Sequence, residues 1–392
     1  DQWALETINA EAAWPLSKGD NILIAVLDTG ADLDHPDLTA KLRTDIDRDF
    51  INNDNVADDD QGHGTHVSGI AAAATDNSTG VAGLGWNAAI LPLKVMDDQG
   101  NGNTSALINA IYYAADNGVK VINMSLGTDP ARDLHCSTDL PALQTAINYA
   151  YNKGVVMVAA AGNESSSGGV APANCTHVIG VAATNRNDKI TYYSNYGDSV
   201  DVAAPGGAFL NQILSTCMGG GYCEKSGTSM ATPYVAGLAA LVFARYPSYT
   251  PDQVAAAIMD NAVDLGDPGW DAYYGCGRID AEATVKNGAP GATPACRSGP
   301  WTQERPLGAL RPQGANEGAY RPGVLIVRLR GGLRVQETTS AFRRLGLTPL
   351  RQLRSGDWLV QVPVGEEAAT LTHLLNDPDV LYAQPDYILE AK

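Results

Sequence analysis

The hydrophobic pattern of residues 1–287 alternates short apolar runs with longer amphipathic stretches. The runs are rich in β-branched residues and lack polar alternation, which predicts strands buried on both faces. Strands that alternate with helices predict an α/β fold with a mostly parallel sheet covered on both sides. The predicted strands are 21–27, 90–95, 119–124, 155–160, 177–182 and 200–204, and the predicted helices include 104–117, 140–152 and 250–261.

A small, flexible stretch at 227–233 (GTSMATP) precedes an almost continuous apolar run at 235–242, which predicts a buried helix. We expect Pro233 in its first turn, where an amide hydrogen has no helical partner. Ser229 would then stand at the helix N-terminus, where free N–H groups and the dipole favour negative charge. This place suits a nucleophile whose reaction forms an oxyanion, although an ordinary capping serine fits it equally well.

The composition changes after residue 287. Residues 288–320 are dense in Gly, Pro and Ala, which predicts a linker. Residues 321–392 then predict a small α+β domain in the order β-α-β-β-α-β, the ferredoxin-like pattern. Its predicted elements are strands at 324–330, 347–353, 358–362 and 380–386, and helices at 335–345 and 366–376.

The charge is unevenly distributed between these parts. Residues 1–287 hold 14 basic and 34 acidic residues, a net charge of −20, whereas residues 288–392 hold 12 and 10, a net charge of +2. The acidic first part argues against a nucleic-acid partner. It also predicts cation sites, because clustered carboxylates repel one another unless something neutralises them.

The cysteines bear on the compartment. The six cysteines form no C-x-x-C pair, which disfavours zinc and fits three disulfides in an oxidising compartment. Fifteen pairings are possible; the short Gly-rich loop favours Cys217–Cys223, and sequence neighbourhood suggests Cys136–Cys175 and Cys276–Cys296. No apolar run reaches the ~18 residues of a membrane span, and the first residues do not form a signal peptide. We therefore expect no membrane partner, and either a cytosolic protein or one whose signal has been removed.

Candidate chemistry lies where predicted strands end. Asp28 follows the first strand, at the edge where an open α/β sheet builds its site. Its Asp-Thr-Gly sequence also occurs in aspartic proteases, but these need a second such motif, and the chain has none. Glycines flank His63, which indicates close backbone approach, whereas we expect His66 to be a packed or capping residue. A zinc site on the two histidines would need a third ligand nearby.

Two further strand ends carry polar residues. They are Ser125-Leu126-Gly127 and the stretch Ala161-Gly162-Asn163, and either alone fits a turn. Asp28, His63 and Ser229 accompany these motifs in the chain order Asp…His…Ser. This is one of the known chain orders of a serine protease triad. Together they resemble the subtilisin-like serine protease family, most closely its thermitase-like and keratinase-like secreted members. The resemblance covers residues 1–287 and implies a three-layer fold.

The resemblance implies a role for each motif. Ser229 would attack the peptide carbonyl, His63 would transfer the proton, and Asp28 would orient His63. Asn163 and the backbone N–H of Ser229 would hold the oxyanion. Ser125, Leu126 and Gly127 would pair with the substrate backbone, next to Ala161 and Gly162. The implied protein is a secreted, monomeric, thermostable endopeptidase that cuts protein and peptide substrates with broad specificity through an acyl-enzyme.

The family's structural calcium sites carry over in part. One expected ligand set comprises Asp37 with Thr75, Asn77, Thr79 and Val81. A second calcium site on Asp54, Asp58 and Asp60 is also expected, with a solvated acidic loop as the alternative.

Residues 321–392 resemble the family's prodomain, an intramolecular chaperone and inhibitor that normally precedes the enzyme. We expect Leu389, Glu390, Ala391 and Lys392 to lie in the substrate cleft, with Lys392 next to Ser229. The unusual order suggests an autoprocessed zymogen with a seam within 288–320; a circular permutation or a fused inhibitor domain are the alternatives. The rival function for the whole chain is a catalytically silent binding protein of the same fold.

Overall fold

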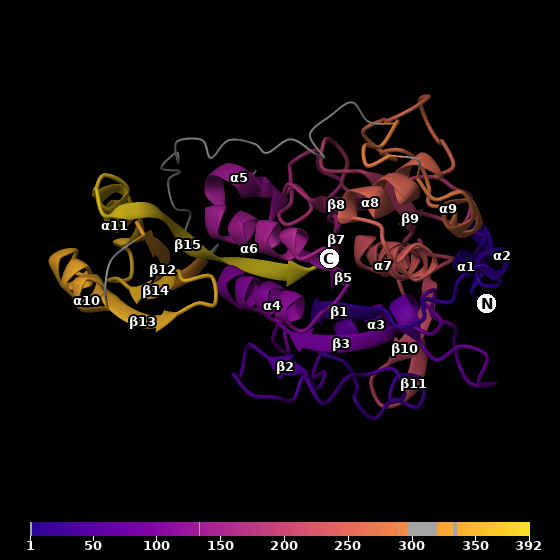
Figure 1. Cartoon of the computed structure of the whole chain (residues 1–392), viewed down its shortest axis with the longest axis horizontal. Helices are drawn as coiled ribbons and strands as arrows, with labels where there is room; N and C mark the ends of the chain where they lie inside the picture. Colours follow the sequence, from indigo (N-terminus) through magenta and orange to yellow (C-terminus); the bar gives the residue numbers. More distant parts are fainter. Residues whose placement is uncertain (1, 133, 290, 297–319, 332–334) are drawn as a thin grey trace.

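A computed structural model describes the chain except for residues 1, 133, 290, 297–319 and 332–334, drawn in grey in Figure 1. Most of the predicted linker at 288–320 therefore lies outside the described residues, and so does the seam expected within it.

A seven-stranded parallel sheet forms the centre of the larger domain (Figure 1). We call this domain the catalytic domain, because the expected catalytic residues Asp28, His63 and Ser229 lie in it. The strand order places β3 on one side of β1 and β5 on the other, so the order reverses at β1. Open α/β sheets form their binding sites at such a switch point. In sheet order the strands are β2 (Arg48–Asp49), β3 (Ala89–Lys94), β1 (Leu23–Asp28), β5 (Val121–Met124), β7 (Val156–Ala160), β8 (Val178–Thr184) and β9 (Val202–Pro205).

Both faces of this sheet are buried, as the unbroken apolar runs predict. In β1, Ile24 and Val26 belong to one hydrophobic core and Ala25 and Leu27 to the other, because side chains alternate across a strand. Helices α3 (His63–Ala72) and α7 (Thr228–Arg245) contribute to the first core, and helices α4 (Thr104–Asp116) and α6 (Pro141–Asn152) to the second. The predicted three-layer α/β arrangement is confirmed.

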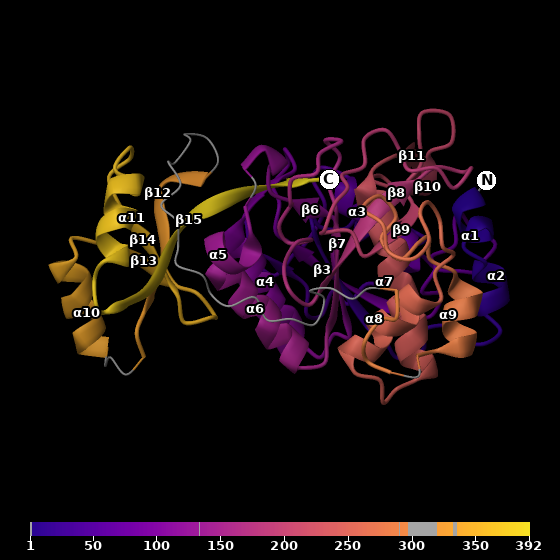
Figure 2. The ribbon, with the colours of Figure 1, turned by 90° about the horizontal axis from the view of Figure 1, so that it is seen from above.

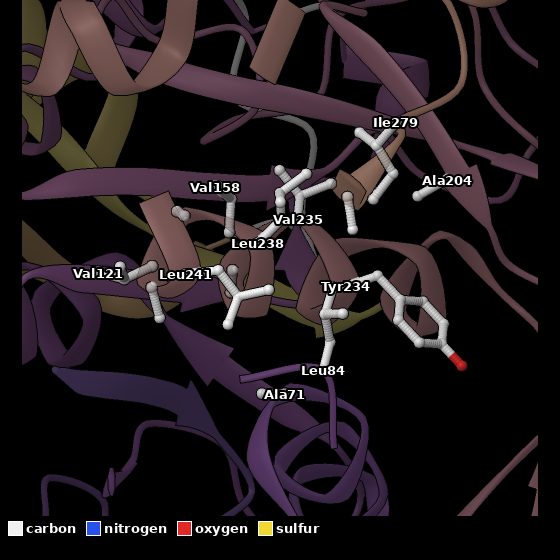
Figure 3. Packing of buried hydrophobic residues seen from close by; sticks show 14 of the residues in the cluster. Ala71, Leu84, Val121, Val158, Ala204, Tyr234, Val235, Leu238, Leu241 and Ile279 are labelled. Atoms are coloured by element: carbon white, nitrogen blue, oxygen red, sulfur yellow. The ribbon is translucent and has the colours of Figure 1, made fainter. Parts of the chain in front are cut away.

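Helix α7 is the central helix of the first core. Figure 3 shows Val235, Leu238 and Leu241 on this helix, packed among side chains from the sheet and from α3. All residues from Thr228 to Phe243 are buried, which explains why the apolar run has no polar face. The expected place of Pro233 is wrong: the helix begins at Thr228, so Pro233 lies in its second turn.

The remaining elements of the catalytic domain are short. Thr250 caps α8, because its hydroxyl accepts a hydrogen bond from Gln253 N. These elements are α1 (Trp3–Thr7), α2 (Ala10–Ala13), β4 (Asn101–Asn103), β6 (Leu126–Gly127), a 3₁₀ turn (Pro130–Arg132), α5 (Cys136–Asp139), β10 (Ile213–Cys217), β11 (Gly221–Lys225), α8 (Pro251–Asp260) and α9 (Ala281–Asn287).

The second domain, here called the C-terminal domain, has the predicted order of elements. They are β12 (Tyr320–Leu329), α10 (Val335–Arg344), β13 (Thr348–Gln352), β14 (Trp358–Gln361), α11 (Glu367–Leu375) and β15 (Val380–Ala391). The strands form an antiparallel sheet in the order β13-β14-β12-β15. The last strand continues to Ala391 rather than ending at the predicted residue 386, because its second half pairs with the catalytic domain.

Strand β15 leaves its own domain and runs into the catalytic domain (Figure 2). At the boundary it caps two helices. The buried carboxylate of Asp386 accepts hydrogen bonds from the amide and hydroxyl of Ser105 at the start of α4, and Gln384 Oε1 accepts one from Ala142 N at the start of α6. These contacts satisfy amides that have no partner within their helices.

Three disulfides connect Cys136 with Cys175, Cys217 with Cys223 and Cys276 with Cys296, which are the three favoured pairs. Among the described residues, no helix is long and apolar enough to cross a membrane.

Candidate active site

Asp28 and His63 meet at the carboxyl end of β1. Asp28 is the last residue of this buried strand, and His63 is the first residue of α3. The carboxylate of Asp28 lies 2.7 Å from His63 Nδ1 and also accepts a hydrogen bond from Thr29 N at 2.8 Å. With Nδ1–H donating to Asp28, the other ring nitrogen is left free to accept a proton.

A second buried carboxylate fixes the position of His63. Asp59 accepts hydrogen bonds from Gly62 N and Thr65 N at the start of α3, and also from the hydroxyl of Thr29. The Thr29 hydroxyl in turn accepts one from Gly64 N. Asp59 therefore connects the residue after Asp28 to the turn that carries His63.

This carboxylate is held in its ionised form. Burial alone would raise the pKa of Asp59, but hydrogen bonds from Gly62, Thr65 and Gln61 outweigh that effect and lower it. The role of Asp59 was not predicted, because nothing in the local sequence distinguishes it from its acidic neighbours.

Ser229 is buried in the first turn of α7 and is coupled to Ser125. Its hydroxyl donates to Ser125 O at 3.1 Å, and the Ser125 hydroxyl donates to Ser229 O at 2.9 Å. Pro233 explains the second bond: it has no N–H to donate to the carbonyl four residues earlier, so Ser229 O is left for Ser125.

The hydrogen-bond partner of the Ser229 hydroxyl thus differs from the expected one. Among the hydrogen bonds of the described chain, it donates to Ser125 and not to His63. The segment Leu389–Lys392 lies in the cleft beside the Ser229 hydroxyl. Hydrogen bonds between catalytic groups are often long outside the reactive complex, so the missing bond to His63 does not argue against the triad.

Asn163 follows β7 and lies close to the start of α7, which carries Ser229. Its Oδ1 accepts hydrogen bonds from the amide and the hydroxyl of Thr228, at 2.9 and 3.0 Å. A side chain on Gly227 would meet Asn163 Nδ2 and the carbonyl of Lys392, each at 3.3 Å. The amide group of Asn163 is thus oriented by Thr228, a residue that the sequence analysis did not single out.

The end of β15 lies between two strands of the catalytic domain as an added antiparallel strand. On one side Leu389 pairs with Gly102, and on the other Ala391 pairs with Leu126 and Glu390 with Gly127. Ala391 N donates to Gly100 O, and Lys392 N donates to Ser125 O. The family resemblance predicts the β6 side of this groove but not the β4 side, where the short Asn-Gly-Asn run carries no strand pattern.

The other predicted substrate residues, Ala161 and Gly162, form buried hydrogen bonds with neighbouring side chains. Ala161 O accepts a hydrogen bond from Asn195 Nδ2, and Gly162 N donates to the hydroxyl of Thr228. Next to them, Lys392 Nζ forms an ion pair with Glu164 at 2.7 Å. These hydrogen bonds fix Ala161 and Gly162, which directly precede Asn163 and Glu164 in the chain.

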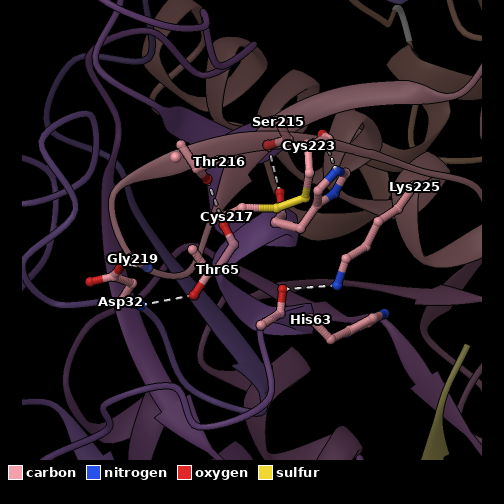
Figure 4. The surroundings of a disulfide bond; sticks show 12 residues. Asp32, His63, Thr65, Ser215, Thr216, Cys217, Gly219, Cys223 and Lys225 are labelled. Atoms are coloured by element: carbon pink, nitrogen blue, oxygen red, sulfur yellow. Dashed lines mark hydrogen bonds between the residues drawn. A yellow bond between two sulfur atoms is a disulfide. The ribbon is translucent and has the colours of Figure 1, made fainter.

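The hairpin of β10 and β11 lies beside His63 (Figure 4). Its disulfide joins Cys217 to Cys223, and Lys225 Nζ donates to Gly62 O. Nε2 of the buried His66 donates to the carbonyls of Ile213 and Cys223 in this hairpin. Burial, with a smaller effect of the nearby Lys225 charge, lowers the pKa of His66 to about 3, so it is a neutral packed residue, as predicted.

Part of the first expected calcium set is assembled. Asp37 is fully buried, and its carboxylate accepts hydrogen bonds from Asn77 Nδ2 and Val81 N, and from the hydroxyl of Tyr222. Thr75 and Thr79 lie in the same loop but direct their hydroxyls to other backbone oxygens.

The second expected set is not assembled. No three His, Cys, Asp or Glu side chains gather as a metal site anywhere in the described residues. Asp60 forms an ion pair with the buried Lys94, whereas Asp54 and Asp58 accept hydrogen bonds from the backbone amides of Val56 and Leu33. The three carboxylates thus have separate partners in the structure, and the calcium site expected on Asp54, Asp58 and Asp60 stays a prediction.

Comparisons with known proteins agree with this geometry. Residues 19–277 match the Subtilase family. The chain is 42% identical to thermitase from Thermoactinomyces vulgaris over 285 residues, which cover 73% of this chain and 96% of that protein. It is 43% identical to a thermophilic serine proteinase from Bacillus sp. strain AK1, with 72% and 67% covered. A solved structure described as proteases from Pseudoalteromonas arctica superposes with a TM-score of 0.66 at 34% identity and covers 73% of this chain and 96% of its own.

Proposed function

The chain belongs to the subtilase family and is a serine endopeptidase, and from this premise we propose that it is a broad-specificity, secreted enzyme inhibited by its own C-terminal domain. The observation that carries the proposal is the pairing of β15 with β4 and β6 beside Ser229. An extended peptide held by main-chain hydrogen bonds on both sides is how a protease of broad specificity binds its substrate.

In the proposed mechanism Asp28, His63 and Ser229 act as one unit. His63 removes the proton of the Ser229 hydroxyl as this hydroxyl attacks the carbonyl carbon of the peptide. The imidazolium that forms is stabilised by the carboxylate of Asp28, 2.7 Å from Nδ1. His63 then gives the proton to the leaving amine, and the acyl group stays on Ser229 until water releases it.

Asn163 and the backbone N–H of Ser229 stabilise the oxyanion of the tetrahedral intermediate. The orientation of Asn163 supports this role. Its Oδ1 accepts two hydrogen bonds from Thr228, so its Nδ2 is available to donate to the substrate oxygen. A donor that is already oriented needs no reorganisation when charge develops on the substrate oxygen.

The C-terminal domain acts as the inhibitor because it binds in the manner of a substrate. Leu389 is fully buried in the groove, and Lys392 reaches the neighbourhood of Ser229. The caps that Asp386 and Gln384 place on α4 and α6 fix the direction in which the strand enters. A domain that prevents access to the cleft in this way gives the protein the character of a zymogen.

A calcium ion at Asp37 completes the proposal for the catalytic domain. Asp37 is a fully buried carboxylate, and no cationic side chain pairs with it in the part of the chain that is described. Asn77 and the backbone carbonyls of Thr75, Thr79 and Val81 add oxygen donors, which calcium prefers. The residues therefore fit a structural calcium ion that would neutralise this charge and stabilise the loop.

Chelation tests the calcium site. We expect a chelator to lower the melting temperature of the full chain by about 5–10 °C, since a ligand at ~100 times its Kd contributes ~2.7 kcal/mol. The Asp37→Asn variant should melt at the lower temperature with or without chelator. A chelator effect of equal size in both proteins would contradict the assignment.

Secretion is supported by the three disulfides, which persist in oxidising compartments.

Digestion of an unfolded protein tests the proposed activity. We expect the full chain to release fragments from reduced, carboxymethylated casein and the Ser229→Ala variant to release none. A Gln substitution at the exposed Glu11 serves as a control for handling and purity. Equal digestion by the wild type and Ser229→Ala would mean that another group or a contaminant performs the hydrolysis.

A further inference from the structure

The hairpin of β10 and β11 connects two parts of the candidate active site. Its strands form a sheet of their own, and a hairpin without further strands is only marginally stable. Lys225, the last residue of β11, donates from Nζ to the carbonyl of Gly62, the residue before His63. Beyond Lys225 the chain continues directly into the turn that carries Ser229. The position of β11 therefore affects both His63 and Ser229.

Strand β10 is firmly anchored to the catalytic domain. The side chains of Ile213, Ser215 and Thr216 are buried. The hydroxyl of Ser215 donates to His66 O at 2.7 Å, and the hydroxyl of Thr216 donates to Thr65 O at 2.7 Å. Both acceptors lie in α3, so β10 is fixed to the helix that begins with His63.

Strand β11 has weaker anchors. Every residue of this strand is at least partly exposed. The carbonyls of Gly221 and Cys223 accept hydrogen bonds from His35 and His66, but His66 shares its proton with a carbonyl of β10. The disulfide between Cys217 and Cys223 is a covalent link from the exposed strand to the anchored one (Figure 4).

This disulfide closes the flexible end of the hairpin. Cys217 lies opposite Gly221, so the bond to Cys223 runs diagonally across the two strands. Between the cysteines, Gly219 and Gly220 adopt positive φ angles of 81° and 75°. Glycine has the largest conformational freedom of any residue, so this turn gains mobility when its ends are released. Loss of the bond therefore loosens the start of β11.

A reductant can reach this disulfide more easily than the other two. Both Cys217 and Cys223 are partly exposed. In the other disulfides Cys136, Cys175 and Cys276 are buried. Exposed disulfides are the ones that thiols reduce most readily.

We propose that the Cys217–Cys223 disulfide is a redox switch: it holds Lys225 against the turn of His63, and a dithiol reductant converts the protease to a slower form. The inference rests on the proposed function, since it assumes that His63 and Ser229 act together. One thiolate of the reductant attacks one sulfur of the disulfide and displaces the other as a thiolate; the second thiol then breaks the mixed disulfide. The reductant ends as its own disulfide, and the two cysteines gain two electrons and two protons.

Reduction acts through the position of the catalytic groups. Once β11 can move, Nζ of Lys225 no longer holds Gly62 O, and the turn of His63 loses a contact to the segment that leads to Ser229. A displacement of catalytic groups by about 1 Å can cost ~100-fold in rate. We therefore expect the reduced protein to hydrolyse a peptide about 10- to 100-fold more slowly.

Peptide hydrolysis with and without dithiothreitol tests the switch in the full chain. The substrate is Leu-Glu-Ala-Lys p-nitroanilide, which has the sequence at the end of β15 and contains no disulfide. The initial rate should fall by the expected factor after reduction and return after reoxidation. Alkylation by iodoacetamide, read by mass spectrometry, should modify Cys217 and Cys223 and leave Cys136 and Cys175 unmodified.

Two pairs of variants test the link. Cys217→Ser/Cys223→Ser should have the rate of the reduced wild type, with or without dithiothreitol. Cys276→Ser/Cys296→Ser, the matched loss of another disulfide, should keep both the rate and the response to dithiothreitol.

Lys225 itself tests the path from the disulfide to His63. Lys225→Met should be slow in the oxidised protein, whereas Lys225→Arg, which can still donate to Gly62 O, should keep most of the wild-type rate. Equal rates in these two variants would overturn the proposed path.

The failures are distinguishable. An unchanged rate in wild type with both Cys217 and Cys223 alkylated, or a loss of rate with both unmodified, would overturn the inference and leave the protease activity standing. Alkylation is measured on the wild type, so this result does not depend on whether the serine variants fold. No release above that of Ser229→Ala by the oxidised full chain would overturn the proposed function and, with it, this inference.

Discussion

The two domains differ in how much of their structure is buried. The catalytic domain encloses a parallel sheet between two large cores, and its Asp28, His63 and Ser229 lie at the buried ends of β1, α3 and α7. The C-terminal domain has a much smaller core, and every residue of its strand β13 is exposed. Its longest strand, β15, is completed only by partners in the catalytic domain.

The difference indicates which domain depends on the other. A domain of about 70 residues buries a smaller fraction of its surface than a large one, so its stability is marginal. Docking then contributes directly to its folded state. The catalytic domain should therefore tolerate changes to its reactive groups without loss of fold, whereas the C-terminal domain should lose both stability and inhibition when its docking contacts are changed.

The largest expected effect separates chemistry from stability in the catalytic domain. Ser229→Ala should lower kcat by about 10⁶-fold, the loss known for the nucleophile of a subtilisin, which is a member of the same family. Because the substitution removes the hydrogen bond to Ser125 O, and this carbonyl still accepts one from Lys392 N, the melting temperature should change by less than about 2 °C. Peptidase assays and calorimetry on the same samples measure both. A large loss of melting temperature would mean that Ser229 has a structural role instead.

A pH dependence should arise within the catalytic domain. Burial lowers the pKa of His66 from 6.5 to about 3, so between these values the unfolded chain binds a proton that the native protein does not. The contribution of neutral His66 to stability is therefore complete above about pH 6.5 and is lost as the pH falls toward 3, by at most about 5 kcal/mol.

Urea unfolding at several pH values measures this contribution. In a Ser229→Ala background that prevents self-digestion, the free energy of unfolding should fall more steeply with acid in the His66 protein than in a His66→Gln variant. Parallel pH curves for the two proteins would contradict the burial of a neutral histidine.

A smaller effect should come from docking. Asp386 is fully buried, accepts three hydrogen bonds from Thr104 and Ser105 and pairs with Arg321. Asp386→Asn removes the charge, which should weaken docking by about 1.5–3 kcal/mol and raise the initial rate of peptide hydrolysis by the full chain. Asp379→Asn, which removes a carboxylate from an exposed ion pair with Arg344, is the matched control and should have little effect. Equal initial rates of peptide hydrolysis in Asp386→Asn and Asp379→Asn would contradict the dependence of the C-terminal domain on its docking contacts.

The parts predicted from the sequence are those that short-range patterns determine. The strands of the sheet and the order of elements in the C-terminal domain follow from apolar runs and spacing, and their ends differ by a few residues from those predicted. The positions of Asp28 and Asn163 at strand ends follow from the same pattern. The three disulfides were also chosen correctly, because each joins cysteines that are near neighbours among the six.

The parts that were missed depend on contacts between distant residues. The hydrogen bond between Thr29 and Asp59, and the one between Thr228 and Asn163, connect segments 30 and 65 residues apart. The ion pair of Asp60 with Lys94 likewise forms only in the folded chain. No local pattern distinguishes these residues from solvated neighbours.

The central claim is that the end of β15 blocks a cleft that is otherwise ready to react. The rate at which a fluorophosphonate labels Ser229 tests it directly, in the full chain and in Ala391→Pro, which removes the N–H that donates to Gly100 O. Val364→Ala, at an exposed position of the same domain, is the control. We predict labelling about tenfold faster or more in Ala391→Pro and an unchanged rate in Val364→Ala. Equal rates in all three proteins would contradict the claim.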